Sequence, residues 1–486
     1  MKVINLLLIG IGPHAKRIYF PIYQKDGESH GFKIVAGVDL EEKRKDIERY
    51  FREKGEFLEM IFILKSQKSY KKLSTAVEDR LNRLVKDLDI QGVIIASEPL
   101  THVMYAKWAL KKGLSILMDK PISTHKDIAT SQKAVSLIKK DFKDLKKLYL
   151  KAKAKNNRYL FSLMAQRRYH PAYKKIKSLL AEIFEETNCP VTSIQTCHAD
   201  GQWRLPHEIV DIKYHSFNEG YGKCSHSGYH FFDIVPWFLE AAEKKNKKIN
   251  NVDVVSNFSR PNDFLSQISL QDYKKIFSNQ KIFNKYSESK LRKLFKNFGE
   301  IDAFNSFVFK HNKQVITLGS INLSHNSFSQ RGWANIGNRD LYKGNGRVRH
   351  ETHLIEQGPF QSISFISYQG KEVNPNKNKN LYRVGGEYHL DIHVFRNDKL
   401  NRKWKNYQKY TLKDFNNLKM SGHSRGHQED ARRKSLIEFV EYLKGKKIKL
   451  QSDFFDHERG SSLVYGVYNS AVKRLNNKNP LVNVLF

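Results

Sequence analysis

The stretch Leu6–Ala15, with the sequence LLLIGIGPHA, decides the fold of the first part of this chain. An apolar run, predicted to be a buried strand, leads straight into a turn with the spacing G-x-G-x-x-A. The residues of this turn are Gly10, Gly12, Pro13, His14 and Ala15. In such a turn the first glycine permits a sharp bend, the second lets the backbone approach a pyrophosphate, and the alanine lets the next helix pack closely. The stretch therefore predicts a dinucleotide bound at the N-terminus of a helix.

An acidic residue follows the second predicted strand. Residues 33–38 form another apolar run, and Asp39 comes directly after it. A carboxylate at this position accepts hydrogen bonds from the adenosine ribose and repels a 2′-phosphate, so it favours NAD over NADP. The basic residues 43–45 could neutralise such a phosphate, which leaves NADP as an open alternative.

The composition indicates a globular protein in a reducing compartment. The chain has 486 residues, of which 40% are hydrophobic, enough for two or three domains. Its three cysteines, Cys189, Cys197 and Cys224, lack paired spacing and argue against a disulfide framework. No apolar run approaches the roughly 20 residues that a membrane helix needs. We therefore expect a soluble, cytoplasmic protein without a membrane partner.

The net charge of +35 raises the question of a nucleic-acid partner. The lysines are spread over the whole chain, often mixed with asparagine, as in residues 244–250 and 374–380. No helix-turn-helix, zinc-finger or RNA-recognition pattern accompanies them. We expect no specific nucleic-acid partner, and a preference for anionic substrates is the functional alternative to a plain compositional bias.

Residues 1–165 are predicted to form an N-terminal Rossmann domain with a doubly wound parallel sheet, because strands and helices alternate along them. The expected strands are 3–9, 33–38, 59–64, 92–97, 114–118 and 158–165, and the expected helices are 14–24, 41–53, 74–88, 101–112 and 124–156.

Residues 166–486 change to short strands with alternating polarity, which predicts a substrate-binding α/β domain with an open, mostly antiparallel sheet. The expected strands are 191–198, 252–259, 303–309, 314–323, 361–368 and 387–396. An insertion with helical segments is expected at 260–300, a surface loop at 371–381, and amphipathic helices at 427–444 and 454–475.

The stretch GLSILMDKPIS, residues 113–123, places Lys120 at the end of the fifth predicted strand. The carboxyl ends of parallel strands line the crevice where such sheets bind ligands. An ammonium there can hydrogen-bond a substrate hydroxyl, and partial burial would lower its pKa and suit it to proton transfer. An ordinary surface lysine at a strand end is the alternative.

The segment CSHSGYHFFDIV, residues 224–235, is a second candidate for chemistry. His226, His230 and Asp233 can share one side of a helix that begins near Gly228, and histidine is a common general base near neutral pH. Two histidines four residues apart, with Cys224 close by, also have the spacing of metal ligands. A helix cap, in which the histidines bond to backbone groups, explains the same residues without chemistry.

Taken in order, the glycine turn, Asp119-Lys120-Pro121 and the helix start G-x-H-x-x-D resemble the Gfo/Idh/MocA family, which includes glucose–fructose oxidoreductase and inositol dehydrogenase. Three more stretches are similar to family patterns: ASEPLTH at 96–102, QRRYHPAYKKIK at 166–177 and SGHSRGHQED at 421–430. The resemblance covers nearly the whole chain in outline, with 260–300 as an extra segment.

The resemblance implies a cofactor site, a catalytic pair and an assembly. The cofactor would be held by Gly10, Gly12, Pro13, His14, Ala15, Asp39, Ser97, Pro99, His102 and Lys120. Lys120 would be the catalytic lysine and His230 the catalytic histidine. The open sheet of the second domain would form part of a homo-oligomer interface.

Two positions depart from the family pattern. The common Glu-Lys-Pro is Asp119-Lys120-Pro121, which shortens one carboxylate arm. The pattern D-x-G-x-H has His226 in its first position, and a histidine lacks the fixed negative charge of an aspartate. This departure does not change the predicted fold, but it leaves the identity of the general base and the substrate class open.

The sequence thus predicts an NAD(P)-dependent oxidoreductase that moves a hydride between nicotinamide and the hydroxyl or keto carbon of a sugar, cyclitol or sugar derivative. The substrate would lie between the nicotinamide and the second-domain sheet, with Lys120, Arg168, Trp203, His226 and His230 as its contacts. Two alternatives stay open: a binding protein on the same fold without redox turnover, and a metal-dependent enzyme built on Cys224, His226 and His230.

Overall fold

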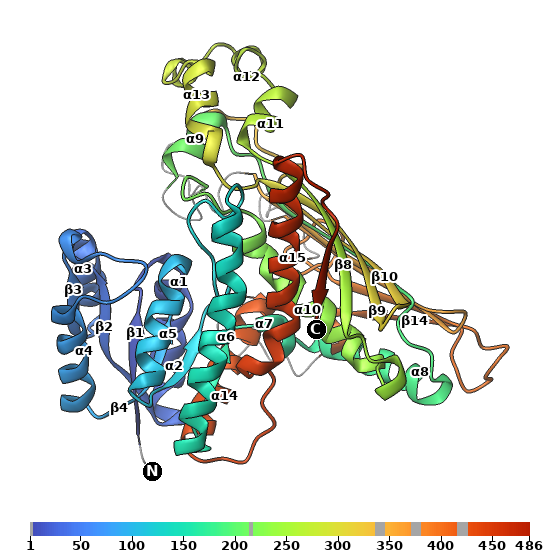
Figure 1. Ribbon diagram of the computed structural model, residues 1–486, viewed down its shortest axis with the longest axis horizontal. Helices are drawn as coiled ribbons and strands as arrows, with labels where there is room; N and C mark the ends of the chain where they lie inside the picture. The colour runs from blue at the N-terminus through green and yellow to red at the C-terminus, as the bar shows by residue number, and fades with distance from the viewer. Residues whose placement is uncertain (1–2, 213–216, 336–345, 371–380, 416–425) are drawn as a thin grey trace. The chain divides into compact units, whose positions relative to one another are not determined.

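The structure, a computed structural model, describes residues 3–212, 217–335, 346–370, 381–415 and 426–486 (Figure 1). The chain forms two compact units, and each is described by itself. Unit 1 comprises residues 1–124, 138–170 and 422–458, and unit 2 comprises residues 125–137, 171–421 and 459–486. Contacts therefore group the chain differently from a single boundary at residue 165, because residues 422–458 return to the first unit.

Unit 1 contains a six-stranded parallel sheet in the order β3-β2-β1-β4-β5-β6. Its strands are β1 (Ile4–Ile9), β2 (Phe32–Leu40), β3 (Glu59–Ile63), β4 (Ile90–Ile95), β5 (Ser115–Met118) and β6 (Phe161–Leu163). This strand order is that of the Rossmann fold, so the predicted fold class is confirmed. The order reverses between β1 and β4, and in open α/β sheets the ligand crevice lies outside the strand ends at that point.

The helices of unit 1 are α1 (Pro13–Arg17), α2 (Tyr19–His30), α3 (Arg44–Lys54), α4 (Thr75–Asp87), α5 (His102–Lys111), α6 (Gln132–Lys155, which begins in unit 2), α7 (Gln166–Tyr169) and α14 (Gly426–Leu443). The predicted helix 14–24 is interrupted at Ile18, where α1 ends and α2 begins. The predicted helix 124–156 begins only at Gln132.

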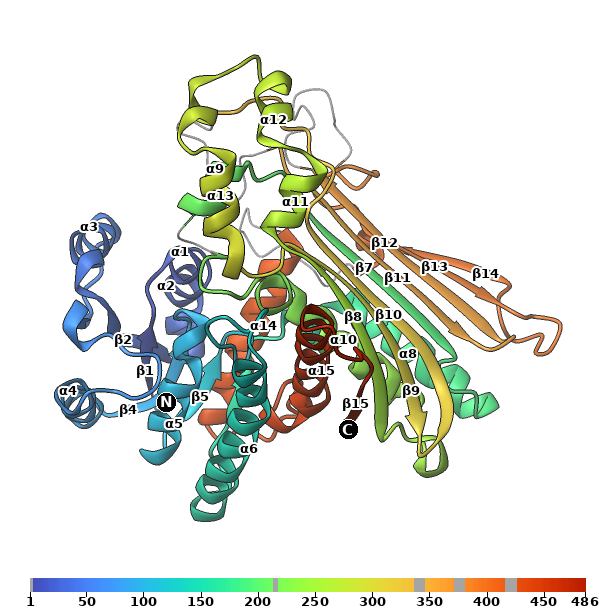
Figure 2. The same cartoon turned by 45° about the horizontal axis from the view of Figure 1, so that its top comes forward.

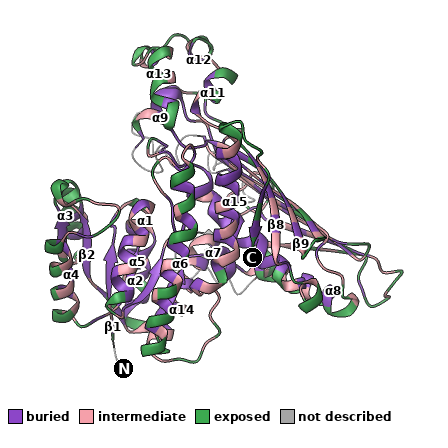
Figure 3. Cartoon of the chain, viewed as in Figure 1, coloured by how far each residue is buried: buried purple, intermediate pink, exposed green. Residues whose placement is uncertain are grey.

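One face of the sheet is covered by α2, α3 and α14, which share a continuous apolar core with it (Figure 3). Leu6 and Leu8 point from β1 into this core, and Phe439 of α14 lies against Gly92 of β4. The last part of the chain thus completes the hydrophobic core of the first.

Unit 2 is built on a nine-stranded sheet in the order β14-β13-β12-β11-β7-β10-β9-β8-β15. Within this sheet, β7 and β10 are the only parallel pair among the described strands, which confirms the mostly antiparallel sheet. The strands are β7 (Ser193–Gln202), β8 (Asn251–Ser259), β9 (Asp302–His311), β10 (Gln314–Asn326), β11 (Val348–Gln357), β12 (Gln361–Gly370), β13 (Asp391–Arg396), β14 (Tyr407–Thr411) and β15 (Val482–Leu485).

Three strands, β11, β14 and β15, were not among those predicted. In β11 the reason is polar burial: Glu351 and His353 occupy inward positions where an apolar residue is expected. Tyr173 donates a hydrogen bond to Glu351, and Thr196 lies 2.9 Å from Nδ1 of His353. These partners satisfy the buried polar groups, so the strand lacks the apolar alternation that marks a half-buried strand.

The helices of unit 2 are α8 (Pro171–Thr187), α9 (Pro206–Asp211), α10 (Tyr229–Leu239), α11 (Pro261–Gln267), α12 (Leu270–Ile276), α13 (Glu288–Leu294) and α15 (Glu458–Leu475). In Figure 2, α9 and α11–α13 gather at one end of the sheet, where they enclose an apolar core of their own. The predicted insertion 260–300 is therefore a small helical layer. Of the predicted loop 371–381 and the stretch 421–430, residues 371–380 and 421–425 lie outside the described residues.

No helix in the described ranges is both long enough and apolar enough to cross a membrane.

A buried carboxyl group fixes the turn Cys224–Gly228, which precedes α10. The carbonyl of Glu300 accepts a bond of 2.9 Å from the N–H of Lys223. Its Oε1 accepts bonds of 2.8 Å from the N–H of Cys224 and from the hydroxyl of Tyr468. Burial raises the pKa of Glu300 to about 7, although these hydrogen bonds favour the charged form. One side chain thus holds the start of the histidine-bearing segment.

We expect Glu300→Gln to change how stability depends on pH. Because the pKa of Glu300 in the folded state lies above its ordinary 4.5, the folded chain binds the proton more tightly than the unfolded chain. This contribution is complete below the ordinary pKa and is lost as the pH rises to about 7. Glutamine keeps the Oε1 acceptor and does not ionise, so the variant does not lose this contribution. Between pH of about 5 and about 8, its free energy of unfolding should therefore rise relative to that of the wild type by on the order of a few kcal/mol.

Denaturant unfolding of both proteins at the two pH values measures this difference. Glu185→Gln, an exposed position on α8, is the matched control and should shift neither curve relative to the wild type. An equal stability difference between Glu300→Gln and wild type at both pH values would contradict the assignment.

Candidate functional site

The glycine turn of unit 1 separates a packed position from an open one. Gly10 has a φ of 93°, and a Cβ added there would lie 2.6 Å from the Cα of Ser97, which follows β4. Gly10 is therefore required by the backbone itself. Gly12 has an ordinary φ of −81°, and a Cβ there would meet nothing within 4 Å. The space over Gly12 is what a pyrophosphate needs for close approach to the backbone.

Asp39 shapes this turn from the end of β2. Its Oδ2 accepts a hydrogen bond of 2.7 Å from the N–H of Ile11, inside the turn. Its Oδ1 accepts one of 2.7 Å from the N–H of Leu40 and lies 3.2 Å from Nζ of Lys43. A carboxylate has about four lone-pair positions, so one that accepts these bonds can still accept ribose hydroxyls. The Lys43 ammonium offsets part of its charge.

The loops after β4 and β5 are joined by His102. Its Nδ1 lies 2.8 Å from the carbonyl oxygen of Pro121, and its Nε2 lies 3.1 Å from that of Ser97. Burial lowers the pKa of His102 to about 4, so the ring is neutral, and the shorter contact assigns its proton to Nδ1. Because the ring faces backbone carbonyls, its role at the predicted cofactor site is to position the two loops. Pro99 begins the short turn between Ser97 and this helix.

Asp119 links the glycine turn to the lysine loop. Its Oδ1 accepts a bond of 2.6 Å from the hydroxyl of Tyr19, and its Oδ2 lies 3.5 Å from Nε2 of His14. Burial raises the pKa of Asp119 to about 6, against the effect of Tyr19 and of the Lys120 charge. Burial also holds the pKa of His14 well below its usual value, and Arg432 and Lys120 lower it further. Lys120 therefore lies at the same sheet edge as the turn.

The residues of unit 1 fit a bound dinucleotide. Open space over Gly12 comes after β1, the carboxylate of Asp39 lies at the end of β2, and the ammonium of Lys120 comes after β5. The carboxyl ends of these parallel strands meet at one edge of the sheet. These are the positions that hold a pyrophosphate, a ribose and a reacting group in Rossmann proteins.

In unit 2 the turn Cys224–Gly228 buries its polar residues. His226 is 5% exposed and lies with its ring edge-on to Phe217 and Tyr221, at centroid distances of 5.6 and 5.1 Å. His230 on α10 is also buried. Burial, together with the neighbouring Glu300 carboxyl, raises the pKa of the Cys224 thiol well above its usual value. Among the described residues no group of three histidine, cysteine, aspartate or glutamate side chains could hold a metal ion, so the predicted alternative of a metal site gains no support.

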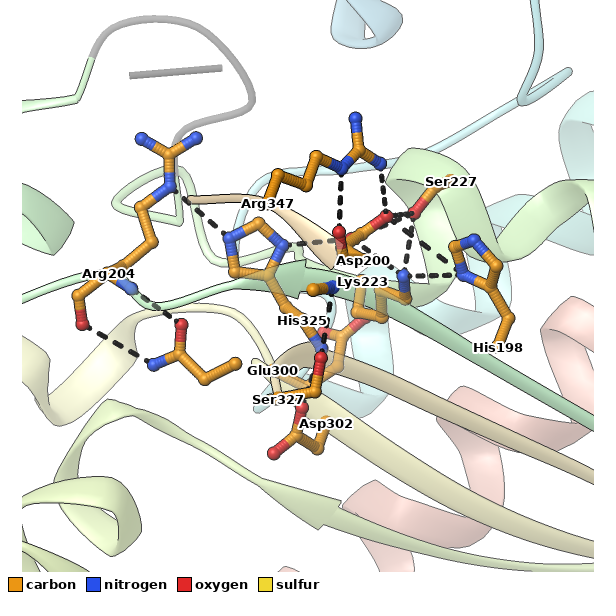
Figure 4. Close-up of polar contacts among 12 residues, drawn as sticks. His198, Asp200, Arg204, Lys223, Ser227, Glu300, Asp302, His325, Ser327 and Arg347 are labelled. Carbon is orange, nitrogen blue, oxygen red and sulfur yellow. Dashed lines mark hydrogen bonds and ion pairs between the residues drawn. The ribbon is translucent and has the colours of Figure 1, made fainter. Parts of the chain in front are cut away.

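Unit 2 contains a buried ion pair that sequence patterns did not single out (Figure 4). Lys223 has no exposed surface, and its Nζ lies 2.6 Å from Oδ2 of Asp200. The same Nζ lies 3.0 Å from Nδ1 of His198 and 2.9 Å from Oγ of Ser227. All three ammonium protons thus have acceptors. Burial lowers the pKa of Lys223, and the Asp200 carboxylate opposes that change.

Two further side chains bind the same carboxylate. Nδ1 of His325 lies 3.0 Å from Oδ2 of Asp200, and Nη2 of Arg347 donates to Oδ1 at 3.4 Å, while its Nε donates to the backbone carbonyl of Asp200 at 2.6 Å. Burial alone would raise the pKa of Asp200, but Lys223 and the bond from His325 hold it well below its usual value. Burial lowers the pKa of His325 to about 4, so its ring is neutral and donates from Nδ1. We call His198, Asp200, Lys223, Ser227, His325 and Arg347 the Asp200 cluster.

A signal for this cluster was present in the sequence. Thr196, His198 and Asp200 alternate along β7 and all point inward. Polar residues at every second position on the buried face of a strand indicate a polar interior. The proximity of Lys223 and His325 to these residues is not visible without the fold.

Two of the predicted substrate contacts are engaged in packing. The guanidinium of Arg168, in unit 1, donates to the carbonyls of Gln451 and Asp456 at 3.4 and 2.9 Å. The indole of Trp203, in unit 2, donates to the hydroxyl of Tyr273 at 3.2 Å and lies against Phe277 in the core of the helical layer.

Comparison with known proteins identifies the first part of the chain. Residues 4–147 match the model of the oxidoreductase family with an NAD-binding Rossmann fold, Gfo/Idh/MocA. The matched segment contains the glycine turn, Asp39 and Lys120. A search of curated proteins finds no match to the sequence.

Solved structures share the fold over the whole chain. The WlbA dehydrogenase from Bordetella pertussis, in complex with NADH and UDP-GlcNAcA, has a TM-score of 0.55 and 10% identity, with 100% of this chain and 98% of that chain covered. The aldose-aldose oxidoreductase from Caulobacter crescentus, complexed with glycerol, has a TM-score of 0.55 and 11% identity, with 100% of both chains covered.

The apo scyllo-inositol dehydrogenase from Lactobacillus casei has a TM-score of 0.52 and 13% identity, with 100% of this chain and 98% of that chain covered. At such identities these likenesses show the fold alone. The family match and the geometry of the turn show the cofactor class. Residues 4–147 thus form a Rossmann unit that matches the NAD-binding domain of the Gfo/Idh/MocA oxidoreductase family.

Proposed function

We propose that this protein transfers a hydride between NAD and the hydroxyl or keto carbon of a sugar, a cyclitol or a sugar derivative. The observation that carries the proposal is the edge of the Rossmann sheet, where open space over Gly12 lies beside Asp39 and Lys120. The relatives of the same fold that are described with sugar-like compounds support the substrate class. Asp39 supports NAD over NADP, and its pairing with Lys43 makes that preference modest.

Lys120 is assigned the contact to the reacting hydroxyl. When bound, NAD supplies the nicotinamide carbon that accepts the hydride. An ammonium that donates to the substrate oxygen orients the carbon that loses hydride and stabilises negative charge on that oxygen. The neighbouring Asp119, with its pKa raised to about 6 by burial, provides a group that can exchange a proton near neutral pH.

His230 is assigned the role of general base, with His226 as a second candidate. Neutral imidazole takes the hydroxyl proton as the hydride leaves, which balances charge on the substrate. The family pattern places an aspartate where this chain has His226. In this chain a fixed negative charge is present instead at Asp200, which accepts hydrogen bonds from Ser227 at 3.3 and 3.2 Å. We therefore propose that Asp200 supplies the negative charge that an aspartate at position 226 would supply in the family pattern.

A binding protein without turnover is the second candidate function, and His226 is the observation that favours it. Such a protein would bind NADH without oxidising or reducing any sugar or cyclitol. The Lys120 experiment below separates the two functions.

We further propose that the outer face of the unit 2 sheet joins copies of this chain. Apolar side chains lie on this face of adjacent strands and are exposed: Phe304, Leu318, Leu354, Phe395 and Tyr407. Exposed apolar side chains that share one face mark an association surface, and a repeated surface favours a symmetric oligomer.

Gly12→Ala tests the cofactor site without disturbing the fold. Because a Cβ there meets nothing and φ is ordinary, we expect unchanged thermal stability. The methyl group occupies pyrophosphate space, so NADH affinity should fall at least tenfold, measured by fluorescence titration with NADPH in parallel. Gly10→Ala is the matched control and should destabilise the fold, since its Cβ would overlap Ser97. Undiminished NADH affinity in Gly12→Ala would contradict the site.

Lys120→Ala tests the chemistry. We expect turnover to fall by about 10²–10⁴-fold, the usual worth of a proton-transfer group, with the NADH dissociation constant within about twofold of wild type. The measurement is NADH formation with a panel of aldoses, sugar acids and cyclitols. Lys112→Ala, at an exposed position after α5, is the matched control. Unchanged turnover in Lys120→Ala removes its assigned role, and NADH binding without turnover of any compound by wild type favours the binding protein.

Phe304→Lys tests the assembly. A charge in the middle of an apolar interface is costly to bury, so we expect wild type to sediment as an oligomer and the variant to shift toward monomer. Leu475→Lys, at an exposed apolar position at the end of α15, is the matched control. Monomeric wild type at concentrations used for structural work would overturn the proposal.

A further inference from the structure

Arg204 is a buried arginine beside the Asp200 cluster. It follows β7, and its backbone N–H donates to Oδ1 of Asn326 at 3.0 Å. Its side chain is anchored by one contact, from Nε to Nε2 of His325 at 3.4 Å. The residue is 1% exposed. In Figure 4 the guanidinium extends from this anchor away from Asp200.

The end of this guanidinium has no acceptor within the described part of the chain. Nη1 of Arg204 is buried and makes no hydrogen bond there. None of the ion pairs found among the described residues includes Arg204. Burial lowers its pKa to about 10, so the group still carries its charge at neutral pH.

The neighbouring carboxylates are already paired. Glu208 accepts two hydrogen bonds from Arg331, at 2.7 and 2.8 Å, in a buried two-point contact. Asp200 lies 2.6 Å from Lys223 and 3.4 Å from Arg347. His325 is neutral and balances no charge. Asp200 thus has two cationic partners and Glu208 has one, and no carboxylate in the described part of the chain is paired with Arg204.

A buried cation without a counter-ion is costly, and a ligand anion removes that cost. A planar guanidinium with free N–H groups matches a carboxylate, to which it can donate two parallel hydrogen bonds. Because Arg204 is buried, a singly charged carboxylate also loses less hydration on binding there than a phosphate monoester, which carries nearly two negative charges at neutral pH.

We propose that Arg204 binds a carboxylate of the substrate, so that the substrate is a sugar acid or another carboxylated polyol. The proposal rests on the proposed function and narrows its substrate class. The anchor to His325, which also bonds Asp200, keeps the guanidinium in one orientation.

The test compares ligands that differ only at one carbon: D-glucuronate, D-glucose and D-glucose 6-phosphate. We expect the NADH-loaded full-length protein to bind glucuronate at least about tenfold more tightly than glucose by calorimetric titration, as one charged hydrogen-bonded contact implies. Arg204→Met should reduce glucuronate affinity to that of glucose and leave glucose affinity unchanged. Arg474→Met, an exposed position near the end of α15, removes the same charge and should change neither.

Arg204→Lys covers the case in which Arg204→Met fails to fold. Lysine keeps the charge and loses the two-point geometry, so it should retain a smaller preference for glucuronate over glucose. Glucuronate should also raise the unfolding temperature of the wild-type protein without NADH, while glucose should not, because a ligand that binds the folded state stabilises it.

Each outcome separates this proposal from the proposed function. Arg204-dependent binding of glucuronate without any turnover supports the carboxylate site and overturns the oxidoreductase assignment. Turnover of glucuronate that Arg204→Met leaves intact supports the oxidoreductase and overturns the carboxylate site. Equal affinity for glucuronate and glucose, or no binding of either, also overturns the carboxylate site. Tighter binding of glucose 6-phosphate than of glucuronate overturns it in favour of a phosphate-binding site.

Discussion

The dinucleotide-binding unit depends on one close approach of backbone to backbone. Gly10 lies against Ser97 with no room for a Cβ, which keeps the ends of β1 and β4 together where the strand order reverses. The neighbouring groups are tied to the same edge, because Asp39 accepts a bond from the N–H of Ile11 and the ring of His102 donates to the carbonyl of Pro121. The tight turn at Gly10 leaves Gly12 in open space. A single steric constraint therefore builds the turn and opens the cofactor position.

The second unit depends on the burial of a negative charge. Asp200 is stable inside a sheet because Lys223 and His325, from distant segments, supply donors to its oxygens. A buried charge must be paired to persist, so the segments that carry its partners are held in place. Glu300 performs a similar task, because its carboxyl group accepts a hydrogen bond from the backbone N–H of Cys224 before α10. The histidine-bearing turn is thus fixed by carboxyl groups that do not belong to it.

Local patterns were sufficient for most elements and failed where burial is polar or packing is distant. The strands of unit 1 were predictable because parallel strands buried on both faces are continuous apolar runs. Strand β11 was missed because Glu351 and His353 face inward and rely on partners elsewhere. The return of α14 to the first unit was also missed. Phe439 belongs to an apolar stripe on this helix, but the stripe does not indicate which sheet the helix covers. The packing partners of Trp203 and Arg168 also lie far along the chain, and the substrate contacts expected at these two residues stay predictions.

The Rossmann unit, with its glycine turn, Asp39 at the end of the second strand and Lys120 after the fifth, could be predicted from the amino-acid sequence. These features follow from glycine spacing and apolar periodicity, which act over a few residues. The Asp200 cluster and the buried, unpaired Nη1 of Arg204 became visible only in the folded chain. Whether a charged side chain is balanced depends on which segments surround it, and Asp200, Lys223 and His325 are separated by tens of residues or more. Folding brings such groups together, and no short-range pattern records the pairing.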